Sequence, residues 1–391
     1  MIARITAGLR HKWAEWRATV LFNDGVGWSR WGDPDKAIAD YTAVIEMANA
    51  PAAQRAKALN NRGWAWSRKG DSDKEMADYT AVVEMADAPA EQKAWALFAR
   101  GWAWGEKGEL DRATADYTAM VEMAGAPAAQ KVKALYNRGV AWGERGDPDK
   151  AIADYTAVVE MADATAEEKA RARSARGVAW SAKGDPDKEI ADCTAVVEMA
   201  DAPAEQKATA LFNRGVAWGD KGEPDKAIAD YAAVVEMAGA LAEDKAMALV
   251  NRGWAWREQG EPDKAIADCT AVVEMADAPV GQKALAFANR AWVLYRAGDV
   301  AALVCDSRRA LELDATLGFA RFSLGLGLLL GGQVGEAAEE YRDAAALCRT
   351  SAEVSEDGIA DLEAAIAERG PIKGADEILE LLRAREAELR T

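Results

Sequence analysis

The chain has 391 residues with 48 Lys or Arg and 65 Asp or Glu, which gives a formal net charge of −17. This acidity repels phosphate-rich partners and argues against nucleic-acid binding; we interpret it as a source of solubility for a long array. The alanine-rich composition, without strand-like alternation of polar and apolar residues, predicts helix throughout.

The N-terminal segment and the cysteines bear on the compartment. Lys12, Glu15 and Arg17 interrupt the apolar core that a signal peptide requires, and no apolar stretch has the length of a transmembrane helix. Cys193 and Cys269 occupy a position that holds tyrosine in sister segments, so we interpret them as small core residues. We therefore expect a cytoplasmic protein with no membrane partner.

From Ala18 onward one unit recurs every 38 residues. An Arg-Gly pair marks its phase at Arg62-Gly63, Arg100-Gly101, Arg138-Gly139, Arg176-Gly177, Arg214-Gly215 and Arg252-Gly253. Asp24-Gly25 opens the series, and Arg290-Ala291 continues it. A period between about 20 and 50 residues predicts stacked copies of one supersecondary unit, because no single copy can bury its apolar face alone.

Each unit is predicted to be two antiparallel helices joined by a tight turn. Pro51 marks the start of one first helix, because proline is tolerated where the N–H has no helical partner. Gly70-Asp71 ends that helix, with glycine just after its last residue. The second helix follows, with Ala77, Val82 and Met85 on one side.

Residues at fixed offsets in each copy carry a family resemblance. In the second copy they are Gly63, Trp66, Gly70, Tyr79 and Val82. In the ninth copy they are Gly325, Gly332, Ala337, Tyr341 and Ala344. The pattern resembles the tetratricopeptide repeat, a unit of about 34 residues, over about residues 18–351. The resemblance implies an all-α, right-handed superhelical solenoid, here with one additional turn at the start of most first helices.

We divide the chain into four parts. Residues 1–17 are the end of an N-terminal helix that caps the first repeat, residues 18–283 are seven 38-residue units, and residues 284–351 are two 34-residue units. Residues 352–391 are capping helices, which give the array a polar outer face. Thr350 and Glu353 predict a capping box at their start, and Gly370-Pro371 separates two helices.

Little in the sequence supports an enzyme. The single histidine, His11, lies between Arg10 and Lys12, and no glycine-rich phosphate loop follows a strand. One aspartate recurs in each second helix, at Asp40, Asp78, Asp116 and Asp154. We interpret this series as a solvated face, because catalysis needs one asymmetric cluster. We expect no catalytic residue, metal site or cofactor.

An asparagine precedes the arginine in most units, and this series is the predicted peptide-binding site. It comprises Asn23, Asn61, Asn137, Asn213, Asn251 and Asn289. An amide donates and accepts at once, so it can pair with the N–H and C=O of an extended peptide. The series resembles the asparagine ladder of one tetratricopeptide superhelix and the asparagine in the carboxylate clamp of other tetratricopeptide domains. Lys57 and Lys133 fit a basic position of that clamp, but Ala99 stands where it has an arginine. The alternative is that each amide bonds a neighbouring helix or faces water.

The 15 tryptophans form two main series. Trp28, Trp66, Trp104, Trp142, Trp180, Trp218 and Trp256 fill a position that packs between the two helices in the resembled family, and we interpret them as core. Trp64, Trp102, Trp254 and Trp292 occupy a position that faces the concave groove in that family. We predict that these four anchor a ligand side chain. Packing against the next first helix is the alternative.

The fifth copy departs from the pattern and creates a basic spot of Arg171, Arg173 and Arg176. This spot predicts a bound anion or acidic segment, unless it reflects drift in a tolerant array. Groove charges also change along the chain, from Arg30, Lys57 and Arg68 to Asp220 and Glu258. This change favours a ligand with its acidic end toward the first repeats.

Three functional hypotheses follow. The favoured one is a non-enzymatic protein-interaction scaffold that holds an extended peptide or a partner helix in the concave groove. The second is a self-assembling structural array, because near-identical units present self-similar surfaces from which homo-oligomers form. The third is a regulatory or sensor subunit of a separately encoded effector enzyme. The sequence does not choose between the concave and convex faces as the binding surface.

Overall fold

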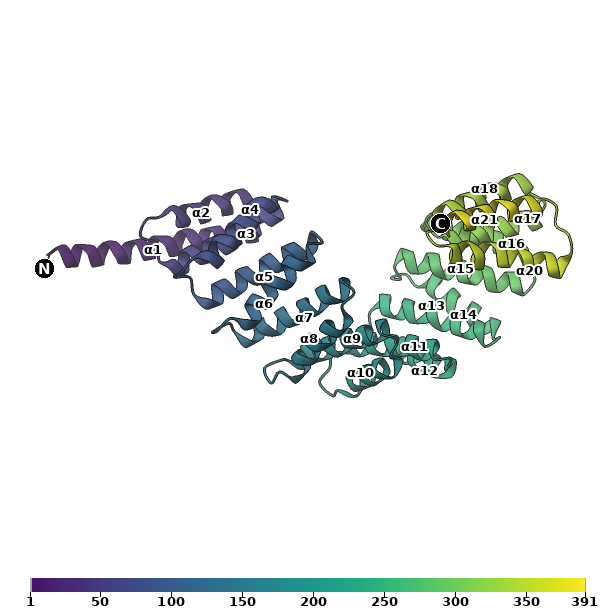
Figure 1. Cartoon of the computed structure of the whole chain (residues 1–391), viewed down its shortest axis with the longest axis horizontal. Helices are drawn as coiled ribbons and strands as arrows, with labels where there is room; N and C mark the ends of the chain where they lie inside the picture. The colour runs from purple at the N-terminus through teal and green to yellow at the C-terminus, as the bar shows by residue number, and fades with distance from the viewer. Residues whose placement is uncertain (1, 391) are drawn as a thin grey trace. The chain divides into compact units, whose positions relative to one another are not determined.

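The computed structural model describes residues 2–390, and describes side chains from residue 12 onward. In this part of the chain every regular element is helical (Figure 1). Two compact units are distinguished. The first runs to Ala195 and includes Met199–Asp201, and the second comprises Val196–Glu198 and the chain from Ala202.

Helices alternate along the chain as the first and second members of antiparallel pairs. The first helices are α1 (Ile2–Arg30), α3 (Ala52–Arg68), α5 (Ala90–Glu106), α7 (Ala128–Glu144), α9 (Ala166–Ala182), α11 (Ala204–Asp220), α13 (Ala242–Glu258), α15 (Val280–Arg296) and α17 (Gly318–Leu330). The second helices are α2 (Pro34–Glu46), α4 (Ser72–Glu84), α6 (Leu110–Glu122), α8 (Pro148–Glu160), α10 (Pro186–Glu198), α12 (Pro224–Glu236), α14 (Pro262–Glu274), α16 (Val300–Leu313) and α18 (Val334–Leu347). This arrangement confirms an all-α repeat solenoid.

The extra residues of the long units lie at the start of the first helix. Helix α3 has 17 residues and places Gly63 after eleven of them, whereas α17 has 13 residues and places Gly325 after seven. The additional turn is therefore the N-terminal one. The boundaries drawn from the sequence at residues 17/18 and 283/284 fall inside α1 and α15, so they mark the phase of the repeat and not the ends of helices.

A left-handed glycine closes the turn between the two helices of each pair. At the end of α7, Gly146 has φ +76° and donates its N–H to the Gly143 carbonyl, while Asp147 donates to the Trp142 carbonyl. These two bonds form a Schellman motif, which satisfies the last carbonyls of the helix. Pro148 follows as the first residue of α8, where its missing N–H leaves no donor unpaired.

Within a pair, the two helices approach most closely where glycine meets tyrosine. A Cβ atom on Gly139 would lie 2.6 Å from Cε1 of Tyr155, so only glycine allows this contact. In the fifth pair Cys193 replaces the tyrosine, and a Cβ on Gly177 would lie at an ordinary 3.6 Å from its Sγ atom. Cys193 and Cys269 are both buried thiols outside any disulfide of the described residues, in agreement with their interpretation as small core residues.

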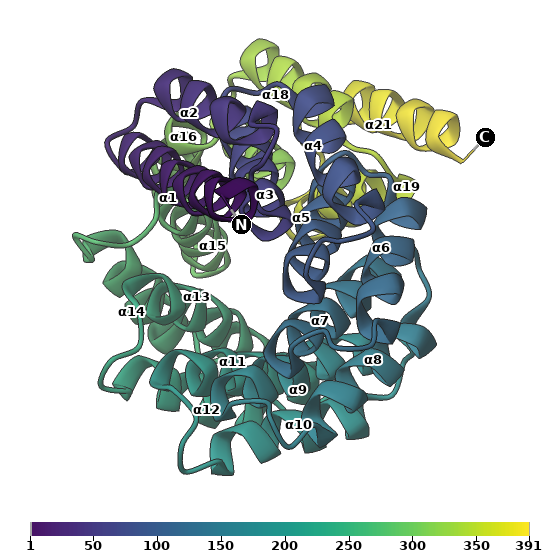
Figure 2. The ribbon, with the colours of Figure 1, turned by 90° about the vertical axis from the view of Figure 1, so that its left-hand side faces the viewer.

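First helices form the inner side of each unit. Successive first helices contact one another, namely α1, α3, α5, α7 and α9 in the first unit and α11, α13, α15 and α17 in the second. Second helices of adjacent pairs make no comparable contact within residues 2–390. Figure 2 shows the same relationship, with α7 inside α8 in the first unit and α11 inside α12 in the second. A ligand held on the inner side would therefore meet first helices.

The array ends in a tail of α19 (Ser351–Glu353), the π-helix η1 (Val354–Ile359), α20 (Ala360–Arg369) and α21 (Ala375–Leu389). Thr350 accepts the N–H of Glu353, but the Glu353 carboxylate accepts from the N–H of Arg349, so the predicted capping box forms only in part. Leu362 and Leu382 are buried in a core shared with α17 and α18. No helix in the described residues is long and apolar enough to cross a membrane.

Candidate ligand-binding surface

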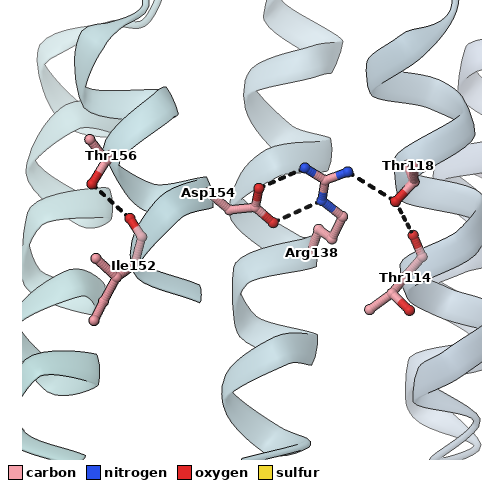
Figure 3. Close-up of polar contacts among 6 residues, drawn as sticks. All are labelled: Thr114, Thr118, Arg138, Ile152, Asp154 and Thr156. Carbon is pink, nitrogen blue, oxygen red and sulfur yellow. Dashed lines mark hydrogen bonds and ion pairs between the residues drawn. The ribbon is translucent and has the colours of Figure 1, made fainter. Parts of the chain in front are cut away.

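In most repeats one arginine connects three helices. Arg138 of α7 donates through Nε and Nη2 to both carboxylate oxygens of Asp154 in α8, at 2.8 and 2.6 Å (Figure 3). Its Nη1 donates at 2.9 Å to the hydroxyl of Thr118 in the preceding second helix α6. Pairing with Asp154 raises the pKa of Arg138. A bidentate, charge-assisted pair of this kind fixes orientation as well as position.

The same arrangement recurs along both units. The Arg–Asp pairs are Arg62–Asp78, Arg100–Asp116, Arg138–Asp154, Arg176–Asp192, Arg214–Asp230, Arg252–Asp268 and Arg290–Asp306. The prediction that the aspartate series is a solvated face is therefore wrong beyond the first repeat. In that repeat Asp24 replaces the arginine, and burial together with the charge of Asp24 raises the pKa of Asp40. The series is structural, and where the threonine acceptor is present it ties a first helix to two second helices.

The seven tryptophans interpreted as core are only partly buried. Trp142, for example, packs against the core with one part of its surface, and the Lys150 ammonium lies 4.3 Å from its ring centroid. Corresponding cations lie over the other six rings, at Lys36, Lys74, Arg112, Lys188, Lys226 and Lys264. A cation covers one face of each ring through a cation–π contact. These tryptophans therefore lie at the edge of the core, near the turns, and are not fully enclosed by it.

The four groove tryptophans divide into two kinds. Trp64, Trp102 and Trp254 are about half exposed, at 47–49%. Trp292 is less exposed and packs 5.3 Å from the ring of Tyr295. Three exposed indoles on first helices are available to an external group, whereas Trp292 belongs partly to the core.

The asparagine series lies on the first helices but is not uniform. The Nδ2 groups of Asn137 and Asn251 donate to the carbonyls of Lys133 and Met247, one turn earlier in their own helices, at 2.8 and 2.9 Å. Their oxygens remain available as acceptors. Asn23 is exposed, and Asn61, Asn213 and Asn289 are partly exposed. The neighbouring Asn60, which the sequence did not single out, is buried and donates to the Gln92 carbonyl at 3.1 Å.

A cavity of about 240 Å³ lies on this surface in the first unit. Phe98 of α5 and Tyr136 of α7 supply aromatic walls, and Lys133 and Asn137 stand beside them. From α9, Arg171 places its guanidinium 5.0 Å from the Tyr136 ring centroid. The cavity can therefore hold an apolar side chain close to a cation.

This geometry corrects the predicted basic spot. Arg176 is bound to Asp192 in the structural series, and Nη1 of Arg173 lies 3.7 Å from the same carboxylate. Of the three arginines, only Arg171 lines the cavity. No group of three or more His, Cys, Asp or Glu side chains that could hold a metal ion is found in the described residues.

Stacked helix pairs, left-handed glycines at the turns and an inner row of first helices define a helical-repeat solenoid. The sequence matches the tetratricopeptide repeat family over residues 30–91, 136–206 and 212–281, more than half of the chain. The chain belongs to the tetratricopeptide repeat family. No curated protein sequence matches it.

Solved structures share this fold at low sequence identity. The apo form of RapI matches with a TM-score of 0.58 and 10% identity, covering 95% of this chain and 98% of that chain. The apo form of the quorum sensor NprR from B. thuringiensis matches with a TM-score of 0.52 and 13% identity, covering 85% and 97%. The C-terminal part of a TPR repeat-containing protein from Cytophaga hutchinsonii matches with a TM-score of 0.50 and 14% identity, covering 65% and 95%. At these identities the likeness concerns the fold alone.

Proposed function

We propose that this protein is a non-enzymatic interaction scaffold of the cytoplasm that holds an extended peptide or a partner helix on its first-helix surface. The observation that carries the proposal is the cavity of the first unit. It places Asn137 and Lys133 beside the rings of Phe98 and Tyr136 on the inner side of that unit. An apolar side chain fills the cavity, and the amide of Asn137 meets the adjacent peptide backbone.

The exposed tryptophans extend this surface. Trp64 and Trp102 lie one repeat apart on α3 and α5, at 47% and 49% exposure. Large rings on an exposed surface are frequent anchors of binding energy. Arg62 and Arg100 tie α3 and α5 to the second helices on either side, so the anchors are preorganised and binding loses little entropy in ordering them.

The test compares two fourfold variants as baits in a native lysate, with captured proteins identified by mass spectrometry. The groove variant carries Asn→Ala at Asn61, Asn137, Asn213 and Asn251. The matched control carries Ala→Gln at exposed positions of second helices, namely Ala77, Ala115, Ala153 and Ala229. A partner lost only in the groove variant supports the proposal. A partner lost only in the control variant would place the binding surface on the outer side.

Self-assembly is the second candidate, and one observation favours it. Trp13 and Trp16 of α1 are 55% and 63% exposed, and Val20 is exposed beside them. An apolar group of this kind on a terminal helix can contact a second copy. Light scattering that shows a monomer at every accessible concentration would exclude this candidate, and a mass that falls in a Trp13→Glu, Trp16→Glu variant would support it.

A further inference from the structure

A second cavity, of about 180 Å³, lies in the second unit where the repeats meet the C-terminal tail. Glu356 and Asp357 of η1 and Asp361 of α20 line it together. None of these three carboxylates makes an ion pair within residues 2–390. Glu356 and Asp357 are exposed and Asp361 is partly buried, and carboxylates gathered in this way destabilise one another.

The tail geometry brings the three acids together. Asp357 and Asp361 lie four residues apart and so share one face of a helix. The π-helical turn of η1 precedes α20 directly. Gly358 of this turn packs against the ring of Phe322, and a Cβ atom on Gly358 would lie only 3.0 Å from Cε1 of that ring. Such single π-turns occur frequently at functional sites.

The opposite wall of the cavity supplies neutral acceptors and rings. Ser323 of α17 lines it, is only 8% exposed, and has no hydrogen-bond partner for its hydroxyl in the described part of the chain. Asn289 and Trp292 come from α15, and Phe319 comes from α17. Oxygen acceptors and an aromatic face are the groups that recognise an ammonium or guanidinium ion.

The one cation in the lining is already engaged. Arg257 donates from Nη2 to Glu258 at 3.0 Å, and its guanidinium lies 5.6 Å from the Trp254 ring centroid. Arg296, near the cavity, pairs with Glu368 at 3.0 Å. The lining therefore holds three carboxylates and one arginine that is already paired with Glu258, so acidic groups outnumber basic ones.

We propose that this cavity binds the ammonium or guanidinium group of a lysine or arginine side chain from the protein or peptide held on the first-helix surface. The inference rests on the proposed function for the origin of that side chain. The preference of the site for a cation is argued from the residues that line the cavity alone.

The protonation of the empty site agrees with this assignment. Burial, followed by the charge of Asp357, raises the pKa of Asp361 to about 7, against the opposing charges of Arg296 and Arg257. Burial, with Glu356 and Glu353, also raises the pKa of Asp357. A bound cation favours the ionised carboxylates, so binding releases a proton near neutral pH and strengthens as pH rises.

The test titrates the full chain with N-acetyl-lysine methylamide and N-acetyl-arginine methylamide. The readout is the indole N–H resonance of Trp292, assigned by its loss in Trp292→Phe. We expect saturable shifts with both cationic probes and none with the isosteric N-acetyl-norleucine methylamide. Affinity should rise between about pH 6 and pH 8, and that rise should vanish in Asp361→Asn.

Two variants and a matched control decide the outcome. Asp357→Asn with Asp361→Asn should weaken probe binding by about tenfold or more, and Ser323→Ala should weaken it less. Glu380→Gln removes an exposed acid of α21 outside the cavity and should leave binding unchanged. Equal shifts with the norleucine probe, or unchanged affinity in the double variant, would overturn the inference.

The single-residue probes test the cavity independently of the asparagine series. If the wild type fails to bind the probes while the groove variant loses its partner, the cation site is refuted and the scaffold proposal stands. If the wild type binds the probes while the groove variant keeps its partner, peptide binding by the asparagine series is refuted and the cation site stands.

Discussion

Arg138 and Asp154, one on each helix of a pair, are joined by two parallel hydrogen bonds of 2.8 and 2.6 Å. Because the same guanidinium also donates to Thr118 of the preceding pair, one side chain fixes both the geometry within a repeat and the contact between repeats. Thr118 in turn donates its hydroxyl to the Thr114 carbonyl at 2.7 Å (Figure 3). We call this Arg–Asp–Thr arrangement the clamp. In a solenoid each repeat contacts only its neighbours, so the clamp adds to the interface energy between repeats, on which cooperative unfolding depends.

Replacing Asp154 by asparagine tests the clamp. The variant leaves a mostly buried guanidinium without its counter-charge, and we expect the free energy of unfolding to fall by about 3 kcal/mol. Urea denaturation followed by circular dichroism measures the change, and amide hydrogen exchange should locate it in α7 and α8. A midpoint equal to that of the wild type would contradict the clamp.

The control for this substitution is Glu312→Gln, which breaks a pair of exposed side chains. Arg309 and Glu312 are joined at 2.7 Å but are 62% and 59% exposed. Exposed pairs contribute little to stability, so this variant should differ little from the wild type. A loss as large as that of Asp154→Asn would mean that charge removal alone explains both.

The sixth Arg–Asp pair offers a stabilising substitution. Arg252 makes both bonds to Asp268, but Ala232 stands where other repeats have the threonine acceptor. Ala232→Thr supplies that hydroxyl, and we expect a gain of about 1 kcal/mol after the lower helix propensity of threonine is subtracted. Ala229→Thr, on an exposed site of the same helix, should lose a few tenths of a kcal/mol. Thermal or urea denaturation that ranks the two variants equally would contradict the role of the hydroxyl.

The repeated sequence predicted the elements well because each signal occurs many times. Proline before the first helix and glycine after it recur in most copies, and α3 and α7 begin and end where those residues place them. The tyrosine position was likewise identified as a core position, but its close approach to glycine was not predicted. The Arg–Asp pairs, which depend on how two helices face each other, were not predicted. Their signal in the sequence is only a constant separation of 16 residues, as between Arg138 and Asp154. That separation was present in the sequence and could have identified the pairs.

The two cavities were beyond the sequence for different reasons. In the first, Asn137 and Arg171 were both singled out, but their proximity to Tyr136 follows from the contact between α7 and α9. In the second, Asp361 lies in the tail, where no repeat supplies a comparison and a π-helical turn sets the register. Local irregularity of this kind has no periodic signal to detect.

The glycine–tyrosine contact predicts opposite effects for the same substitution in two repeats. Gly139→Ala puts a Cβ 2.6 Å from a buried tyrosine ring, and we expect a loss of about 2 kcal/mol from overpacking. Gly177→Ala meets Cys193 at 3.6 Å, so the higher helix propensity of alanine should dominate with a gain of about 0.5 kcal/mol. Urea denaturation of both variants checks the signs. Equal losses would show that the helices are equally close in both repeats.

The raised pKa of Asp361 predicts how stability depends on pH. Folding raises this pKa from 3.8 to about 7, so the folded state holds the proton more tightly than the unfolded state. The stabilisation of the folded state by the protonated Asp361 is fully present below about pH 4 and is lost as pH rises through about 7. Asp361→Asn should therefore match the wild type near pH 4 and exceed its melting temperature increasingly up to about pH 8, as calorimetry can measure. A difference between the two proteins that does not change with pH would mean that the Asp361 carboxylate lies in an aqueous environment and that the tail cavity does not confine it.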